Sequence, residues 1–432
     1  MSIKLNFIYT GIISIVTIVI QFLVVTVLGK QGPEMLASYN LIEIVFAFIP
    51  AFLLIGGDPY YQYKINNLEC DNSRVIFHFK YVLYSFLLLF ILASSLLSFY
   101  YFFSDKNLKD FYFLILVSLA SYLIYISSFA ERANLNILKS SIIERTFYLI
   151  NGVVILSTVV VFGYTGEVDV VFNAALISSV AVVPYMLFRF VVFCHKNREV
   201  LSSSFDIGFS SVFDKGALYF WLTAITIFIY ERVDQVFIAH YFEYAILGFY
   251  FACYKLSFIL RLVTNVVYSV IYPYLAKFTK TDLSKALHMH KLSLYFTSVV
   301  AISLSLPLLF FPRQILEIVY DNRYVEYSFL LKIVALSMIF SCVNQVNFAL
   351  INAKGKSKFI FYNSLVCVAL QFIFIYMFYL KLGVLAVGVA RLVAVSFGFI
   401  MSFYILGREF FKIHYLIIIF ILLMVTFIGG TQ

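Results

Sequence analysis

Long apolar runs separated by short polar connections form the dominant pattern of this 432-residue chain. A run of about 20 apolar residues is long enough to cross the hydrocarbon core of a bilayer as a helix. We count twelve such runs and a marginal thirteenth, and we expect each of the twelve to be a transmembrane helix. Their approximate bounds are 5–28, 36–57, 77–103, 111–130, 146–163, 168–194, 217–240, 248–275, 292–311, 328–352, 359–380, 384–406 and 412–429.

The longest polar stretch divides these runs into two halves. It covers residues 195–215, with six runs before it and six or seven after it. Many transporters are built from two repeats of this kind. The predicted fold is therefore an all-α polytopic membrane protein with two six-helix lobes. The predicted parts are an N-terminal lobe at 1–194, a cytoplasmic linker at 195–215, a C-terminal lobe at 216–406, and a segment at 407–432 that holds the marginal thirteenth helix.

Composition agrees with a membrane protein and excludes a soluble one. Hydrophobic residues make up 63% of the chain and charged residues 12%, against about 25% charged residues in ordinary soluble domains. The net charge is +9. The charges lie in short connections and not on one face or tail, so membrane lipids are expected partners and nucleic acid is not.

Basic residues in the connections predict the orientation. With the N-terminus in the cytoplasm, nineteen Lys and Arg residues fall in inside segments and six in outside segments, as the positive-inside rule requires. The first apolar run is too long for the apolar part of a cleaved signal, so we expect it to be retained.

Several charged residues lie inside the predicted spans, where a charge is costly and usually faces a cavity or a partner. Arg232, Lys255 and Arg391 lie roughly 10–12 Å below the outer surface at 1.5 Å per residue, and Arg261 lies near the middle of its span. We interpret these four as a cationic binding site for an anionic substrate, although Lys255 could also snorkel to the surface. The alternative is a set of structural ion pairs, such as Asp234 with an arginine on a neighbouring helix.

Two acidic residues and several polar stripes complete the candidate site. Glu43 and Asp234 are candidates for ion coupling or for a gate. Polar residues recur at helical spacing in spans one, seven and eight, which places each set on one helix face. Such a face lines a water-filled path or bonds to a neighbouring helix. The candidate lining residues are Thr17, Gln21, Tyr230, Asn265 and Tyr268.

The usual enzyme motifs are absent from the sequence. There is no GxxxxGK[ST], GxSxG or HExxH. The five cysteines are scattered singly, which predicts neither a metal site nor a disulfide framework. We would expect a membrane polymerase to have a long outer connection, and no outer connection of this chain is long. We therefore expect no catalytic residues, no cofactor and no metal.

Several segments of the second half resemble one family. The stretch from Glu231 to Ile238, followed by Leu247 to Leu256, resembles the pattern R-x-D-x-(apolar)…G-x-Y-x-x-A-x-(R/K)-(apolar) of the polysaccharide transporter branch of the multidrug/oligosaccharidyl-lipid/polysaccharide exporters, which includes the O-antigen flippases. Three further segments resemble its later motifs, and they are Tyr272 to Leu275, Phe311 to Tyr324 and Leu382 to Gly388. The chain departs from the pattern at His240 and Tyr241, and in the extra run after Arg408.

This resemblance implies two lobes around a central cavity that opens to either side of a bacterial cytoplasmic (inner) membrane. The implied substrate is an oligosaccharide on undecaprenyl pyrophosphate, an O-antigen or capsule repeat unit, moved from the inner to the outer leaflet for polysaccharide biosynthesis. A polysaccharide polymerase and a chain-length regulator are implied partners. The alternatives are a drug or cation antiporter of the same superfamily, a membrane polysaccharide polymerase or glycosyltransferase, and a scaffold for a synthesis complex.

Overall fold

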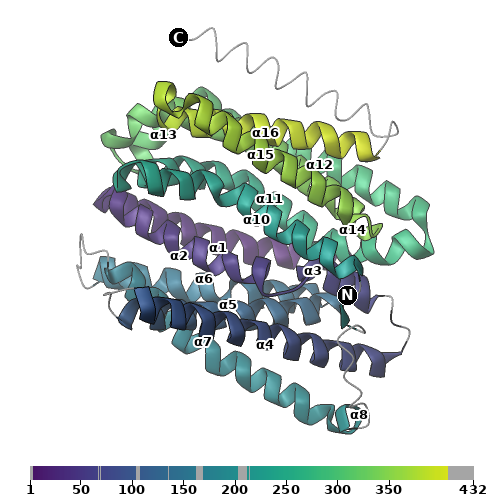
Figure 1. Cartoon of the computed structure of the whole chain (residues 1–432). Helices are drawn as coiled ribbons and strands as arrows, with labels where there is room; N and C mark the ends of the chain where they lie inside the picture. The colour runs from purple at the N-terminus through teal and green to yellow at the C-terminus, as the bar shows by residue number, and fades with distance from the viewer. Residues whose placement is uncertain are drawn as a thin grey trace. The chain divides into compact units, whose positions relative to one another are not determined.

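The computed structural model of the chain describes residues 3–66, 68, 70–103, 108–134, 136–161, 169–202, 212–213 and 215–406. Within these residues all regular structure is helical (Figure 1). The all-α fold expected from the apolar runs is therefore confirmed. The predicted thirteenth helix at 412–429 lies outside the described residues.

The first half of the chain forms a series of long helices with three short elements among them. Each long helix overlaps one of the predicted apolar runs. The bounds are α1 Ile3–Gln31, α2 Pro33–Phe52, α3 Gly57–Ile65, α4 Asp71–Phe103, α5 Leu108–Ala133, α6 Ile137–Leu156, the π-helix η1 Ser157–Val161, α7 Asp169–Lys196 and α8 Arg198–Ser202.

The second half repeats this pattern. Two short elements, α13 and η2, connect α12 to α14. The bounds are α10 Lys215–Tyr241, α11 Tyr244–Thr281, α12 Leu283–Phe310, α13 Pro312–Val319, the 3₁₀ helix η2 Asn322–Tyr327, α14 Ser328–Ala353, α15 Ser357–Leu382 and α16 Val384–Leu406.

Ten helical segments in the described residues are long and apolar enough to cross a membrane, and the count becomes eleven if the two parts of α11 form one span. These two parts, Tyr244–Arg261 and Thr264–Thr281, meet at an angle of 43°. Helix α10 has 27 residues and matches the predicted run at 217–240, but it is not among the eleven. It carries Glu231, Arg232 and Asp234 within four residues, which lowers its mean hydropathy.

The chain divides into two compact units. The N-terminal unit is Ile8–Phe228, and the C-terminal unit is Met1–Phe7 with Ile229–Gln432. The division passes through α10. The predicted linker at 195–215 contains the end of α7 and all of α8, and its residues 203–211 lie outside the described part of the chain.

Helix α14 lies at the centre of the C-terminal unit. Helices α11, α12 and α16 all pack against it, and α15 packs against α16 (Figure 1). Gly398 on α16 allows that second approach, because a Cβ atom there would lie 2.9 Å from Sγ of Cys367 on α15. Within the N-terminal unit, α5 holds the equivalent place and packs against α2, α3, α6 and α7.

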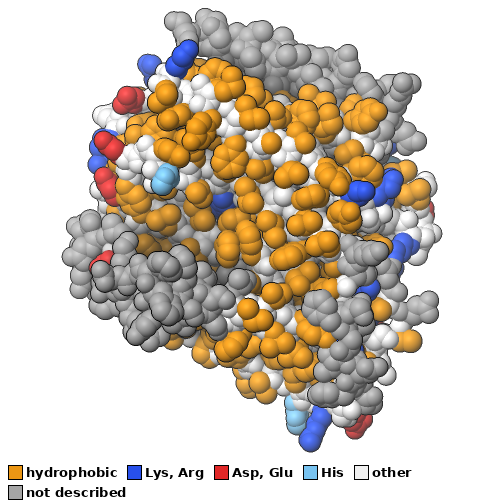
Figure 2. Space-filling model, viewed as in Figure 1, with side chains coloured by type: hydrophobic (Ala, Val, Ile, Leu, Met, Phe, Trp, Pro, Cys, Tyr) orange, Lys and Arg blue, Asp and Glu red, His pale blue; other side chains and the backbone are white. Residues whose placement is uncertain are grey.

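The outward faces of the helices are apolar. On α15, Tyr376, Met377 and Leu380 are 62%, 63% and 82% exposed. Hydrophobic side chains cover much of the face seen in Figure 2. Such a surface would be unfavourable in water and is favourable against lipid chains, so it supports the assignment as a membrane protein.

A glycine turn positions α3 at the end of α2. Gly56 has φ of +80°, and a Cβ atom there would lie 2.4 Å from the Cβ atom of Tyr60. Only glycine adopts this backbone conformation without strain. The turn lets α3 begin at Gly57, and it places the next residue, Asp58, against α5.

Candidate functional site

A buried charge pair joins α10 to α16 in the C-terminal unit. The side chain of Asp234 is 0% exposed and that of Arg391 is 2% exposed. Nη1 of Arg391 forms an ion pair with Oδ2 of Asp234. The hydroxyl of Tyr250 on α11 donates to the same oxygen at 2.5 Å, and the backbone N–H of Gln235 contacts Oδ1 at 2.8 Å. Three helices therefore meet at one carboxylate.

A second ion pair lies less than one turn earlier on α10. Glu231 pairs with Nη2 of Arg261 on α11, and their side chains are 21% and 12% exposed. Arg391 also donates to the backbone carbonyl of Glu231 at 3.4 Å, which links the two pairs. Arg232 is half-buried and donates from Nη1 to Oε1 of Gln235 at 2.9 Å.

These contacts bring together three of the four predicted cationic residues, namely Arg232, Arg261 and Arg391. The contacts also match the alternative interpretation, because Asp234 pairs with an arginine of another helix. Both interpretations apply to the same atoms.

Three nitrogen donors of this cluster are buried without a hydrogen-bond partner among the described residues. They are Nε of Arg391, Nη1 of Arg261 and Nε2 of Gln235. A buried donor that makes no hydrogen bond costs about 1–3 kcal/mol, and more when it belongs to a charged group. All three are N–H donors. Arg391 and Arg261 both contact Glu231, whereas the side chain of Gln235 contacts Arg232 and its backbone N–H contacts Asp234. A group rich in acceptor oxygens would satisfy them.

Aromatic rings of α11 lie against two of the cations. The guanidinium carbon of Arg391 on α16 lies 5.0 Å from the centre of the Tyr254 ring. Nζ of Lys255, the fourth predicted cation, lies 5.3 Å and 5.6 Å from the ring centres of Phe251 and Phe258. Cation–π contacts of this kind hold a charge at modest cost in a site with little water.

The predicted lining residues of α11 and α10 have different surroundings. Asn265 accepts a hydrogen bond from Nε2 of Gln345 on α14 at 2.7 Å, so it joins two helices. Tyr268 is half-buried and stacks on Tyr272, with ring centres 5.2 Å apart. Tyr230 is half-buried, in the turn before Asp234. Only the contact of Asn265 identifies a helix–helix role.

The remaining predicted residues belong to the N-terminal unit. Thr17 is 6% exposed, and its hydroxyl donates to the carbonyl of Ile13 in its own helix at 2.8 Å. Gln21 is half-buried. Glu43 is 6% exposed and lies one turn from the buried Tyr39 on α2.

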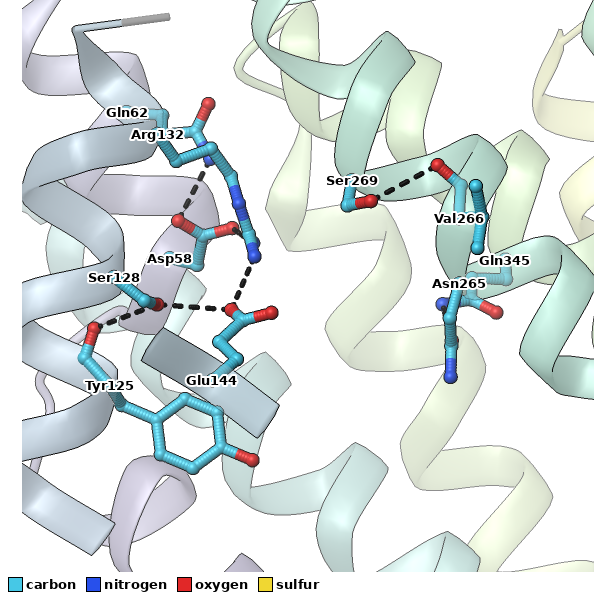
Figure 3. A network of polar contacts seen from close by, with 10 residues as sticks. All are labelled: Asp58, Gln62, Tyr125, Ser128, Arg132, Glu144, Asn265, Val266, Ser269 and Gln345. Carbon is cyan, nitrogen blue, oxygen red and sulfur yellow. Dashed lines mark hydrogen bonds and ion pairs between the residues drawn. The ribbon is translucent and has the colours of Figure 1, made fainter. Parts of the chain in front are cut away.

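Sequence reasoning missed a buried charge network in the N-terminal unit (Figure 3). Arg132 on α5 pairs with Oδ2 of Asp58 on α3 at 2.5 Å and with Oε1 of Glu144 on α6. Gln62 donates to the other oxygen of Asp58 at 2.8 Å, and Ser128 donates to Glu144 at 3.0 Å. One arginine therefore serves two carboxylates from different helices.

The lengths of the predicted spans explain why this network was missed. The predicted runs 111–130 and 146–163 leave Arg132 and Glu144 in the connection between them, which the predicted orientation places in the cytoplasm. In the structure α5 continues to Ala133 and α6 begins at Ile137, and both residues therefore lie on helices. The repeated pairs of an acid followed by an arginine, at 131–132 and 144–145, were the available signal.

No metal site is apparent in the part of the chain that the structure describes, where no three His, Cys, Asp or Glu side chains are grouped to hold an ion. The cluster on α10, α11 and α16 instead offers guanidinium and amide donors. Its chemistry is suited to binding oxygen acceptors.

No family model and no curated protein sequence matches this chain. Solved structures do match it. A MATE protein in complex with MaL6 is 13% identical, with a TM-score of 0.68 over 93% of this chain and 96% of that one. An outward-facing multidrug resistance MATE family transporter of the MOP superfamily is 12% identical, with a TM-score of 0.66 over 100% of this chain and 98% of that one.

A third similar structure is a MOP superfamily transporter from Pyrococcus furiosus Vc1, for which a binding pocket of reverse polarity is described as suggesting a different function. It is 11% identical, with a TM-score of 0.66 over 93% of this chain and 95% of that one. The chain therefore has the fold of the MATE transporters. At sequence identities of 11–13%, these similarities establish the fold and do not identify a substrate.

Proposed function

We propose that this protein is a transporter that moves an undecaprenyl-pyrophosphate-linked oligosaccharide from the inner to the outer leaflet of a bacterial cytoplasmic membrane. The observation that carries this proposal is the set of unpartnered buried donors on Arg261, Arg391 and Gln235. A pyrophosphate presents many acceptor oxygens, and a guanidinium matches phosphate oxygens with two parallel N–H groups.

The charge balance of the C-terminal unit supports an anionic substrate. Two acids and five basic residues lie within its predicted membrane spans, so these spans remain positive after each acid is matched with one arginine. A cationic substrate would be repelled by this surplus. The residues are Glu231, Arg232, Asp234, Lys255, Arg261, Lys332 and Arg391.

The two ion pairs suggest how the site would bind its substrate. Glu231 and Arg261 are partly exposed, whereas Asp234 and Arg391 are buried. Arg261 is therefore the residue that we expect to contact pyrophosphate, with Glu231 as its partner when substrate is absent. Asp234 would hold Arg391 in place and carry no coupling ion. The N-terminus would lie in the cytoplasm, and a polymerase with a chain-length regulator would act on the product.

A drug or cation antiporter is the second candidate. Two observations favour it. The similar structures include a multidrug resistance transporter. The N-terminal unit also has the opposite charge bias, because Glu43 is buried in α2 and Arg132 serves two carboxylates. Acidic residues of this kind suit a cationic drug or a coupling proton.

A flipping assay in proteoliposomes distinguishes the two candidates. A lipid-linked oligosaccharide is placed in both leaflets, and a sugar-modifying enzyme is added outside. The proposal expects the protected half to become accessible only when the protein is present. Uptake of a fluorescent cationic drug against a proton gradient, with no change in glycan accessibility, would instead establish the antiporter. A longer glycan would establish a polymerase.

The paired variant Glu231→Gln/Arg261→Gln tests the site itself. It removes both charges together and retains hydrogen-bonding groups, so no uncompensated charge is left in the membrane. We expect flipping to fall at least roughly tenfold, the loss of one charge-assisted hydrogen bond to phosphate. Arg313→Ala, which changes an exposed arginine of α13, is the control and should flip normally. Normal flipping by a folded paired variant would refute the role of Arg261.

A further inference from the structure

A large cleft in the N-terminal unit lies apart from the groups described above. Its volume is about 750 Å³, and its walls come from α3, α4, α5 and α7. The cleft has a charged end and an apolar remainder. The charged end is formed at the start of α4 and the end of α5, which the distribution of basic residues places on the cytoplasmic side.

The charged end contains equal numbers of acidic and basic side chains. Arg189 on α7 pairs with Glu131 on α5 at 2.7 Å, and these side chains are 30% and 18% exposed. Arg74 contacts Asp71 on α4 at 3.3 Å, where the side chains are 39% and 93% exposed. Pairs this exposed are worth about 0–1 kcal/mol. A ligand could therefore replace either contact at low cost.

The rest of the cleft is lined by apolar and aromatic side chains. Between this part and the charged end, the hydroxyl of Tyr61 is hydrogen-bonded to Nδ1 of His78 at 2.6 Å. Beyond this pair the walls offer only weakly polar surface. The apolar lining includes Val82, Phe86, Leu123, Ile126, Leu187 and Phe190.

The length of the cleft matches one leaflet of a bilayer. Arg74 and Phe86 are twelve residues apart on α4, which is about 18 Å at 1.5 Å per residue. Half of a hydrocarbon core is about 15 Å. Phe86 on α4 and Leu187 on α7 are 43% and 42% exposed. Lining residues of both helices are therefore partly exposed at the surface of this unit, where a lipid chain could enter.

We propose that this cleft binds a membrane phospholipid whose zwitterionic headgroup carries a primary ammonium, as in phosphatidylethanolamine. The phosphate would lie at Arg74 and Arg189, the ammonium would donate to Asp71 and Glu131, and one acyl chain would follow the apolar wall. A purely anionic headgroup would face both carboxylates. A quaternary ammonium has no N–H to donate to them. The inference goes beyond the proposed function, because it does not depend on the transported substrate.

Lipid retention by the purified protein tests this inference. The full-length protein is equilibrated with an equimolar mixture of phosphatidylethanolamine, phosphatidylcholine and phosphatidylglycerol of the same acyl chains, and bound lipid is counted by native mass spectrometry. We expect phosphatidylethanolamine to be retained preferentially. Arg74→Ala/Arg189→Ala should lower its retention roughly tenfold or more, since two charge-assisted contacts are lost. Arg198→Ala, an exposed arginine of α8 that does not line the cleft, should have no effect.

Two further variants separate charge from shape. Asp71→Asn/Glu131→Gln removes the carboxylates, and it should shift the preference toward phosphatidylglycerol. Ser127→Phe fills the cleft, and it should lower the retention of all three lipids while leaving the charges intact. Equal retention of the three lipids by the wild type, or retention unchanged in the arginine and Ser127 variants, would overturn the proposal. So would displacement of phosphatidylethanolamine by equimolar polyprenyl phosphate, which would assign the cleft to the transported lipid.

Discussion

The buried pair of Asp234 and Arg391 gives the sharpest stability prediction. The single variant Arg391→Met keeps the approximate length of the side chain and removes its charge. Asp234 then stays 0% exposed without its cation. Removing one partner of a buried pair costs about 3–5 kcal/mol. For a folding unit of this size that corresponds to a fall in Tm of roughly 6–20 °C.

The less buried pair of Glu231 and Arg261 provides a comparison for the stability effect within the same protein. Glu231 and Arg261 are 21% and 12% exposed, so Arg261→Met leaves a carboxylate that is less enclosed than the carboxylate of Asp234. We expect a smaller fall in Tm, nearer the range of partly exposed pairs. The double variant Asp234→Leu/Arg391→Met removes both buried charges, and it should recover most of the loss of the single variant.

The assay is thermal unfolding of the purified protein in one detergent, followed by tryptophan fluorescence at Trp221 and by gel filtration. The double-mutant cycle consists of the wild type, Asp234→Leu, Arg391→Met and the double variant. Its coupling free energy separates the interaction of the pair from the individual effect of each substitution. The reasoning fails if Arg391→Met and Arg261→Met are equally mild. It also fails if the double variant is less stable than both of its single variants.

Two further predictions concern charges at other places in the chain. Arg132→Ala leaves Asp58 and Glu144 without their shared cation and should cost about 3–5 kcal/mol, against about 1 kcal/mol for Ser128→Ala, as judged by the fall in Tm. Asp321 lies between α13 and η2, outside the membrane spans, and its hydrogen bonds to the side chain of Arg323 hold the pKa of its carboxyl below the usual value of 3.8. Its contribution to stability is therefore present above about pH 4 and is lost as the pH falls through the lowered pKa. Asp321→Asn should make Tm less sensitive to acid than in the wild type, and parallel profiles would contradict this.

The positions of the helices were largely readable from the sequence, because the bilayer imposes a length and a polarity on each span. Every predicted run from 5–28 to 384–406 corresponds to a helix. The runs underestimated helix length where polar residues continue a helix beyond its apolar part, as at the end of α5. The segment α3 was not predicted, because the run at 36–57 ends where α3 begins and its residues were part of the following connection. The break before it depends on the positive φ of Gly56.

The partners of the buried charges were harder to predict than their presence. The pairing of Asp234 with an arginine of a neighbouring helix was one of the two interpretations, and that contact is present. Which arginine it would be depends on how α10, α11 and α16 pack, and no periodicity in one helix contains this information. The network of Arg132 was missed for a different reason, because the predicted spans ended before Arg132 and began after Glu144.

The central helix α14 differs from the central helix of a typical soluble protein. In a soluble protein the most enclosed helix is usually the most hydrophobic one. Here both the interior and the surrounding lipid are apolar, and hydrogen-bonding side chains are concentrated on the enclosed helix. Asn347 donates to Oγ of Ser402 on α16 at 3.0 Å, and that hydroxyl donates to Asn344 at 2.8 Å. These hydrogen bonds connect α14 to α16, so the two helices should move together in any conformational change of the protein.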